Sequence, residues 1–360
     1  MVTEMDKLFD QLQELTALHG VSGCEQEVVK ALKEKFLPLS DQVLVDSFGN
    51  LSALKRGNQN GPRFMISAHS DEVGCVVTHI SRNGFLGVCP VGVIDPRILP
   101  GTRMVVDQRI TGTVVCVPGH TSTNQNEFSK NLLLDIGAKS DVQVQKLGIS
   151  VGSTASFSSP LTRTSQSDRV IGKAIDNRVG CAILLQLFEQ LQGKDFPGEL
   201  FGVVTVQEEI GMMGARMIAH RIHPDFAIVL DTVPLDDTPL NSMPDVPITM
   251  GAGPVIQLRT GKNSVFIGCV AHKKITDLLV TSAQDLDLPL QQTAAYGKWV
   301  TDADAIHQSQ DGIPTSFLSI PRRYGHTPNE IADLGDVRSA IEILVHLVEK
   351  KVGQFNANYF

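Results

Sequence analysis

The chain has 360 residues, which is too long for a single compact core and predicts two domains. Hydrophobic residues make up 42% of the chain and charged residues 19%, as in an ordinary globular protein. The net charge of -8 and the lack of a basic stripe argue against a nucleic-acid partner, because such surfaces need clustered Lys and Arg.

The cysteines and the first residues of the sequence indicate the cellular compartment of the protein. The six cysteines are scattered without a Cys-x-x-Cys pair, which is typical of free thiols in a reducing compartment. The first residues have no apolar core of a signal peptide. No apolar run reaches the ~18 residues of a membrane span. We therefore expect a cytoplasmic enzyme without a membrane partner.

Hydrophobic periodicity predicts the elements before residue 74. Residues 4–18 have leucines at helical spacing, Gly20 to Gly23 break that helix, and the apolar residues between Val28 and Phe36 predict a second one. Strands are predicted at residues 42–46, 51–55 and 64–68. The last of these is a continuous apolar run, as expected of a strand that is covered on both faces.

The segment after Gly74 has a different composition and hydrophobic pattern. As far as Ser159 it is rich in Val, Thr and Gly, and helical periodicity is nearly absent. Short β-type runs separated by Gly and Pro indicate a small all-β module. Its strands are predicted at residues 75–80, 85–88, 103–106, 112–117 and 155–158.

Helix and strand patterns alternate again after Ile171. Helices are predicted at residues 176–192, 214–220 and 335–351. Strands are predicted at residues 200–206, 226–230, 254–259, 298–300 and 315–320. The simplest topology is one discontinuous α/β domain, residues 1–73 and 165–360, interrupted by a β module at residues 74–164.

Five segments carry histidine or carboxylate side chains beside predicted strand or helix ends. These side chains are His69 with Asp71, Asp176, Glu208 with Glu209, Asp231, and His326. In open α/β sheets, ligands bind outside the carboxyl ends of the strands. Imidazole nitrogen and carboxylate oxygen suit zinc, and also manganese or cobalt. Five ligands, one of them bridging, would give each of two metal ions three protein groups and leave room for water.

The consecutive glutamates Glu208 and Glu209 follow an apolar strand. Neighbouring residues in an extended segment point in opposite directions, so one glutamate can bind a metal ion while the other stays free. A free carboxylate within reach of an activated water is what general-base catalysis needs. The pair therefore predicts a hydrolytic site.

Each of these residues alone has a simpler explanation. His69 alone fits a core histidine, Asp176 a helix cap, Asp231 the start of a turn, the two glutamates a solvated strand end, and His326 an ordinary loop residue. These explanations combine poorly, because all five would have to fall by chance where strands end. No Gly-x-Ser-x-Gly elbow or Walker-type phosphate loop offers a competing site.

At this point the chain resembles the M42 family of metallo-aminopeptidases, which includes tetrahedral, glutamyl and deblocking aminopeptidases. The resemblance covers residues 8 to 349, and its motifs are specific in their combination and order. The matching segments are Ser67–Gly74, Ile94–Arg97, Asp135–Ala138, Gly172–Arg178, Val206–Gly211, Leu230–Thr232 and Arg323–Pro328.

The resemblance implies a role for each position. His69 and Asp231 would bind one metal ion, Glu209 and His326 the other, and Asp176 would bridge them. Glu208 would be the general base and acid, and Asp71 would orient His69.

The resemblance also implies a fold and an assembly. It implies a zinc-peptidase-like α/β/α domain with a mixed sheet, interrupted by a small β-barrel or PDZ-like domain. That insert would serve contacts between subunits, because the family commonly forms homododecamers shaped as hollow tetrahedra. Two divalent ions per subunit are implied, with zinc first and cobalt or manganese as alternatives.

One segment departs from the family pattern. Where the family usually has a Gly-Thr-Asp-Ala-Gly-like run near the pocket for the substrate side chain, this chain reads Val300-Thr301-Asp302-Ala303-Asp304-Ala305. The extra carboxylate of Asp304 leaves the side-chain preference open; an acid there would favour basic side chains or hold the substrate amine.

The leading hypothesis is a di-metal aminopeptidase that removes N-terminal residues from short peptides. A deacylase or a carboxypeptidase would use the same site on another amide, and a non-catalytic assembly protein is the alternative of another class. A glycosidase fits less well, because its paired carboxylates need no histidine ligands.

Overall fold

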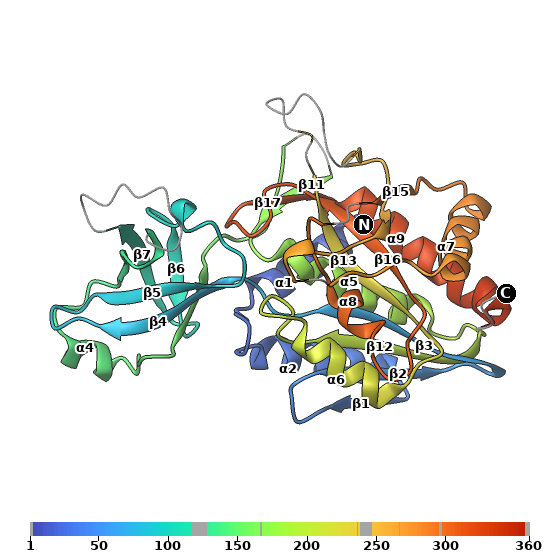
Figure 1. The fold of residues 1–360 in the computed structure, drawn as a ribbon, viewed down its shortest axis with the longest axis horizontal. Helices are drawn as coiled ribbons and strands as arrows, with labels where there is room; N and C mark the ends of the chain where they lie inside the picture. The colour runs from blue at the N-terminus through green and yellow to red at the C-terminus, as the bar shows by residue number, and fades with distance from the viewer. Residues whose placement is uncertain are drawn as a thin grey trace.

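The computed structural model describes residues 3–116, 128–165, 168–235, 237, 247–265, 267–294 and 297–356. Figure 1 shows a large α/β body and a smaller β body beside it, joined where strand β3 (Gln59–His69) leads into β4 (Gly74–Ile80). In the described part of the chain, no helix is both long and apolar enough to cross a membrane.

A mixed sheet of eight described strands runs through the large body in the order β1-β2-β12-β3-β13-β16-β14-β15. Besides β3, its strands are β1 (Gln42–Val45), β2 (Leu51–Arg56), β12 (Pro197–Thr205), β13 (Phe226–Pro234), β14 (Val255–Arg259), β15 (Gln291–Ala294) and β16 (Thr315–Arg322). The four central strands β12, β3, β13 and β16 are parallel. Parallel strands need cover on both faces, which explains their continuous apolar sequences.

Helices cover both faces of this sheet. One face packs against α1 (Glu4–Ala17), α2 (Gln26–Phe36), α5 (Ile175–Gln190), α7 (Lys273–Asp285) and α9 (Leu334–His346). The other face packs against α6 (Met213–Ile222) and α8 (Asp302–Ile306). Along β3, Phe64 and Ile66 belong to the first core and Met65 to the second. The α/β/α arrangement expected for this domain is therefore observed.

The smaller body is a closed barrel in the strand order β4-β5-β8-β7-β6-β9. Besides β4, its strands are β5 (Leu86–Val91), β6 (Arg103–Val106), β7 (Ile110–Cys116), β8 (Leu132–Asp135) and β9 (Thr154–Phe157). It has an apolar core of its own, and the short helix α4 (Asp141–Lys146) contributes Val144 to it. The expected β-barrel is thus confirmed, whereas its likeness to a PDZ domain stays a prediction. Val117, the last residue of one predicted strand, lies outside the described residues.

A third, small sheet of described strands consists of β10 (Thr162–Arg163), β11 (Arg169–Gly172) and β17 (Glu330–Asp333). It returns the chain from the barrel to α5. The remaining short elements are 3-10 turns at Leu37–Leu39, Pro96–Ile98, Asn263–Val265 and Val352–Gln354, and a π-helical turn at Leu347–Lys351.

Several expectations about the later elements were wrong or incomplete. Residues 298–300 were predicted to be a strand, but they form a turn and a loop. The position beside β14 belongs instead to β15, which the sequence reasoning missed. The helices α4, α7 and α8 and the strands β8 and β17 were missed too; most of them have six residues or fewer and therefore show little periodicity.

Candidate metal centre

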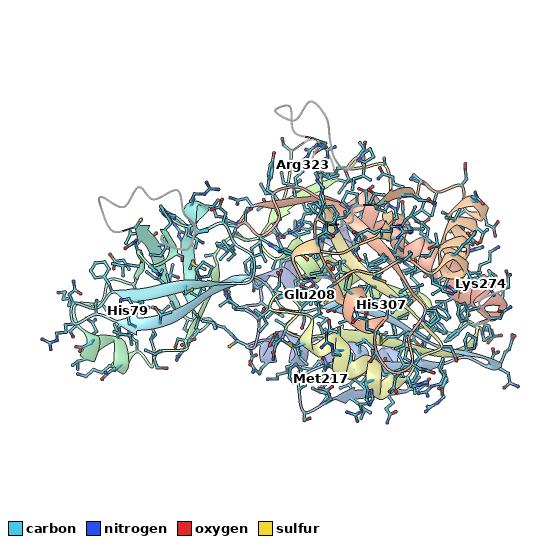
Figure 2. The ribbon with its side chains drawn as sticks, in the orientation of Figure 1. His79, Glu208, Met217, Lys274, His307 and Arg323 are labelled. Atoms are coloured by element: carbon cyan, nitrogen blue, oxygen red, sulfur yellow. The ribbon has the colours of Figure 1, made fainter. Side chains whose placement is uncertain are left out.

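All of the proposed ligands except Asp176 lie in or after the carboxyl-terminal parts of the parallel strands. His69 ends β3 and pairs in register with Thr205, the last residue of β12, so the Glu208–Glu209 segment emerges beside it. Asp231 lies in the second half of β13, and His326 follows β16. Figure 2 shows Glu208 inside the α/β body, whereas His79 lies far from it in the barrel. These four segments therefore meet at one edge of the sheet, as expected for open α/β sheets. Asp176, at the start of α5, lies beside them.

Short distances join these side chains. His69 Nε2 lies 3.2 Å from Asp176 Oδ1 and 3.7 Å from Asp231 Oδ1. His326 Nε2 lies 3.4 Å from Asp176 Oδ2 and 3.3 Å from Glu209 Oε1. Each oxygen of Asp176 thus faces a different histidine, as a bridging carboxylate must.

The donor atoms form three overlapping groups with spacings suited to a metal ion. The groups are His69–Asp176–Asp231, Asp176–Glu209–His326 and His69–Glu208–Glu209, and within each the donor atoms lie within 4.8 Å of one another. Asp176 Oδ1 and Glu209 Oε1 are buried and accept no hydrogen bond from any described residue. Because a buried polar oxygen that accepts no hydrogen bond is costly, the residues present fit a bound cation.

The pKa values of the two histidines also indicate that the site favours positive charge. Burial lowers the pKa of His69, but the carboxylates of Asp176, Asp231 and Asp71 outweigh it, so the pKa of His69 lies well above its usual value. Burial likewise opposes the charged form of His326, yet Glu209 and Asp176 raise its pKa to about 11. Both shifts have the same cause, because the carboxylates around each ring favour a positive charge at that position.

Glu208 differs from Asp176 in the direction of its pKa shift. Burial, together with the nearby Glu209 and Asp231, raises the pKa of Glu208 well above its usual range, although His69 opposes this. Its Oε2 lies 3.9 Å from His69 Nε2, farther than the contacts of Asp176. A carboxyl group with a raised pKa beside a metal-ligand cluster is suited to proton transfer.

The side chain of Asp71 binds the backbone of the Glu208–Glu209 segment. Its two side-chain oxygens accept hydrogen bonds from the N–H groups of Glu208 at 3.0 Å and Glu209 at 3.1 Å, and from the Ser22 hydroxyl at 2.6 Å. His69 Nδ1 lies 3.2 Å from the main-chain carbonyl oxygen of Asp71 and 3.5 Å from its side-chain Oδ1. That Asp71 orients His69 stays a prediction, and its contacts with the glutamate segment are the shorter ones.

Sequence reasoning missed two charged residues beneath Asp176. Arg322 Nη1 lies 3.0 Å from Asp176 Oδ2 and 2.8 Å from Glu330 Oε1. Glu330 also accepts hydrogen bonds from the backbone N–H of Asp176 at 2.9 Å and of His326 at 2.8 Å. The pair thus connects the segments of two proposed ligands. Arg322 is the last residue of the buried strand β16, but no spacing in the sequence links it to Asp176.

Asp304 does not lie where the sequence suggested. Its side chain is buried and caps α8, accepting hydrogen bonds from the Thr301 N–H at 2.8 Å and the Thr260 hydroxyl at 3.1 Å. It does not line the cavity beside the ligands, which measures about 220 Å³. Helix capping turns this carboxylate inward, so it does not reach the cavity directly, and any effect of Asp304 on substrate preference stays a prediction.

The walls of this cavity combine apolar and basic groups. Apart from the proposed ligands, its lining includes Val93, Met212, Lys262, Lys298 and Trp299. Val93 belongs to the barrel, so the inserted domain contributes to the pocket.

Comparison with known proteins agrees with this geometry. The family model described as M42 glutamyl aminopeptidase matches residues 49–343. A putative aminopeptidase of Acetivibrio thermocellus is 35% identical over 345 residues, which cover 96% of this chain and 99% of that protein.

Solved structures share the fold over nearly the whole chain. Aminopeptidase APDkam598 from the archaeon Desulfurococcus kamchatkensis has a TM-score of 0.90 at 32% identity and covers 97% of this chain and 96% of its own. The TET1 peptidase of Pyrococcus horikoshii, described as assembling into a tetrahedron or a large octahedral shell, has a TM-score of 0.81 at 26% identity, with coverage of 95% and 99%. The chain therefore belongs to the M42 aminopeptidase family.

Proposed function

We propose that the protein is a di-metal aminopeptidase that removes N-terminal residues from short peptides. His69 and Asp231 would hold one divalent ion, Glu209 and His326 the other, and Asp176 would bridge them. Zinc is the first candidate, with cobalt or manganese as alternatives. The single observation that carries the proposal is the shared position of Asp176 between two complete ligand groups.

A pair of bound divalent ions would supply Lewis acidity, which polarises a peptide carbonyl and lowers the pKa of a water molecule. Glu208 would take the proton from that water and later give it to the leaving amine. Asp71 would keep the Glu208–Glu209 segment in place through its backbone contacts and would fix the ring of His69. Arg322 and Glu330 would keep Asp176 aimed between the two histidines.

Replacing Glu208 with Gln tests the role of the base. We expect loss of peptide turnover with nearly unchanged metal content, since Gln keeps the size of the side chain but cannot accept a proton. Elemental analysis and hydrolysis of amino-acid anilides measure the two quantities on the same sample. Turnover at the wild-type rate would contradict the assignment.

The same site could act on another amide, as in a deacylase or carboxypeptidase. A panel of amino-acid anilides against N-acyl amino acids separates these activities, and cleavage of the N-acyl compounds alone would exclude an aminopeptidase. A non-catalytic assembly protein would instead stay metal-free after addition of zinc, cobalt or manganese.

We further propose that the chain self-associates as a homododecamer in the cytoplasm, with the barrel making subunit contacts. The tetrahedral assembly of TET1 and a dodecameric structure of PhTET1 support the proposal about assembly. Light scattering of the purified protein measures the mass directly.

A further inference from the structure

We propose that the inserted barrel is a positioning part of the metal centre, because its loop at Val93 fixes the orientation of His326. This inference rests on the proposed role of His326 as a metal ligand. It extends the role of the barrel beyond contacts between subunits.

The Val93 loop of the barrel contacts His326 through one directed hydrogen bond. His326 Nδ1 lies 2.8 Å from the backbone carbonyl oxygen of Val93. A carbonyl can only accept, so Nδ1 must carry the proton, and in the neutral ring Nε2 then keeps its lone pair. That Nε2 faces Asp176 and Glu209 at 3.4 and 3.3 Å. The Val93 carbonyl thus selects the tautomer and the ring direction that a ligand at this position needs.

The Val93 loop belongs to the barrel and is packed tightly against the ligand segments. The next residue, Ile94, is buried in the barrel core. The preceding Gly92 has a φ of 82°, and a Cβ placed there would lie 2.6 Å from Val73 Cγ1 and 3.5 Å from Glu209 Cβ. Since Val93 itself is 67% exposed, the loop reaches the site through its backbone rather than through side-chain packing.

A buried charge cluster fixes the place where the barrel leaves the α/β body. Glu72, two residues before β4, accepts hydrogen bonds from Lys173 Nζ at 2.8 Å and from the Gly20 N–H at 3.0 Å. Arg178 donates to the carbonyl oxygens of Ser70 at 2.8 Å and Leu15 at 2.5 Å. These bonds connect the His69–Glu72 loop with the segment that carries Asp176.

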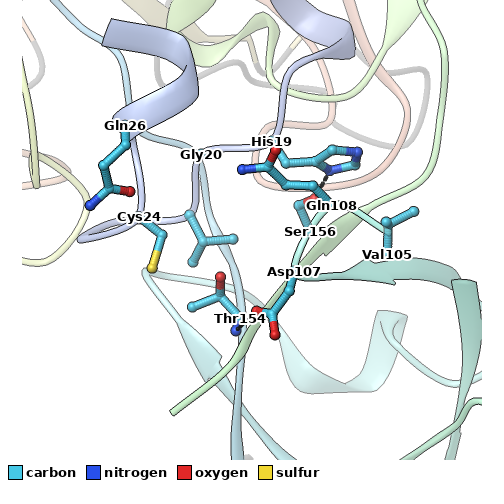
Figure 3. Close-up of a pocket in the computed structure, with 10 residues that line it drawn as sticks. His19, Gly20, Cys24, Gln26, Val105, Asp107, Gln108, Thr154 and Ser156 are labelled. Atoms are coloured by element: carbon cyan, nitrogen blue, oxygen red, sulfur yellow. Dashed lines mark hydrogen bonds between the residues drawn. The ribbon is translucent and has the colours of Figure 1, made fainter. Parts of the chain in front are cut away.

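A second contact joins the barrel to the α/β body. Figure 3 shows the His19 ring against the Ser156 hydroxyl, which joins the loop after α1 to strand β9. Both residues line a cavity of about 210 Å³ between the two bodies. The barrel is therefore docked at several points, so the position of the Val93 carbonyl is set by domain placement.

The two metal positions should then respond differently to a shift of the loop. The barrel's hydrogen bond goes to His326, whereas His69 lies at the end of a central strand and contacts Asp71 of its own segment. A displacement of the Val93 loop should therefore lower the metal affinity of the site that contains His326 more than that of the site that contains His69.

The experiment substitutes glycines in the barrel and titrates the metal-free protein with cobalt(II), followed by its absorption bands. Gly92→Ala places a methyl group against Val73 and shifts the loop. Gly101→Ala is the matched control, since Gly101 has a similar φ of 86° but no atom within 4 Å of the added Cβ. His326→Ala marks the loss of the ligand itself. Val73→Ala combined with Gly92→Ala removes the closest of these contacts, the one with Val73 Cγ1.

We expect Gly92→Ala to weaken one of two cobalt sites by about 10-fold or more, the same site that His326→Ala weakens. Gly101→Ala should leave both sites unchanged, and the double variant should recover at least part of the lost affinity. If Gly92→Ala bound cobalt with wild-type affinity at both sites while His326→Ala lost one site, the inference about the barrel would be overturned. The assignment of His326 as a ligand would then stand. Two unchanged sites in His326→Ala would overturn the ligand assignment, and the inference with it.

Discussion

Replacing Glu72 with Gln should destabilise the protein strongly, although Glu72 is not a proposed metal ligand. Its side chain is 2% exposed, and the two cations beside it, Lys173 and Arg178, are 3% and 0% exposed. Gln can still accept the hydrogen bond from Gly20, but it removes the carboxylate that pairs with both buried cations. Breaking a buried ion pair from one side costs about 3–5 kcal/mol, so we expect a loss of that size in the free energy of unfolding.

Urea unfolding of the metal-saturated protein, followed by circular dichroism, measures this loss. Glu14→Gln is the matched control, because Glu14 pairs with Lys35 at 2.7 Å but is 57% exposed. An exposed pair contributes at most about 1 kcal/mol. Adding Lys173→Met to Glu72→Gln removes one uncompensated cation and should recover about 1–3 kcal/mol. A loss below about 1 kcal/mol for Glu72→Gln would refute the reasoning, since the cluster would then not depend on its carboxylate.

Three further predictions concern the pocket, a helix cap and pH. Because Lys262 and Lys298 line the cavity and Asp304 does not, peptides with an N-terminal Glu or Asp should be hydrolysed faster than those with Lys or Arg. Lys262→Met should lower this ratio of rates, and Lys30→Met, at an exposed position outside the cavity lining, should not. The same ratio of acidic to basic peptide hydrolysis in Lys262→Met and in Lys30→Met would contradict this prediction. Asp304→Ala should cost about 2 kcal/mol of stability through the lost α8 cap, without changing the ratio of lysyl to leucyl anilide hydrolysis. Burial raises the pKa of Asp336 to about 6 from 3.8, so the native state binds more protons than the unfolded state between these values. The stability of the wild type relative to Asp336→Asn should therefore be greatest below pH 4 and fall by on the order of 3 kcal/mol as pH rises through 6, and a difference that does not change with pH would contradict this.

The sequence predicted the part of the site that follows the strand pattern. His69 and the Glu208–Glu209 pair come directly after apolar runs, and parallel strands bring their carboxyl ends to one edge. The α/β body and the β module could also be predicted from the hydrophobic pattern. Helical and strand patterns occur together before Gly74, whereas only short β-type runs follow it.

Contacts between distant segments could not be predicted in this way. Glu330 meets the backbone of Asp176 across 154 positions of the chain. The Val93 carbonyl meets His326 across 233 positions, and no local pattern marks a backbone carbonyl as a partner. Asp304 was misplaced because its capping bonds turn it inward. The helix α7 was missed although Ile275, Leu278 and Leu279 have helical spacing.

The most direct test of the central claim is the number of cobalt ions bound by the metal-free protein and by its Asp176→Ala variant. The account predicts two ions per wild-type chain. It predicts weakened binding at both positions in Asp176→Ala, because that carboxylate faces both histidines, whereas His326→Ala should weaken only one. Two ions bound with unchanged affinity in Asp176→Ala would contradict a shared, bridged centre.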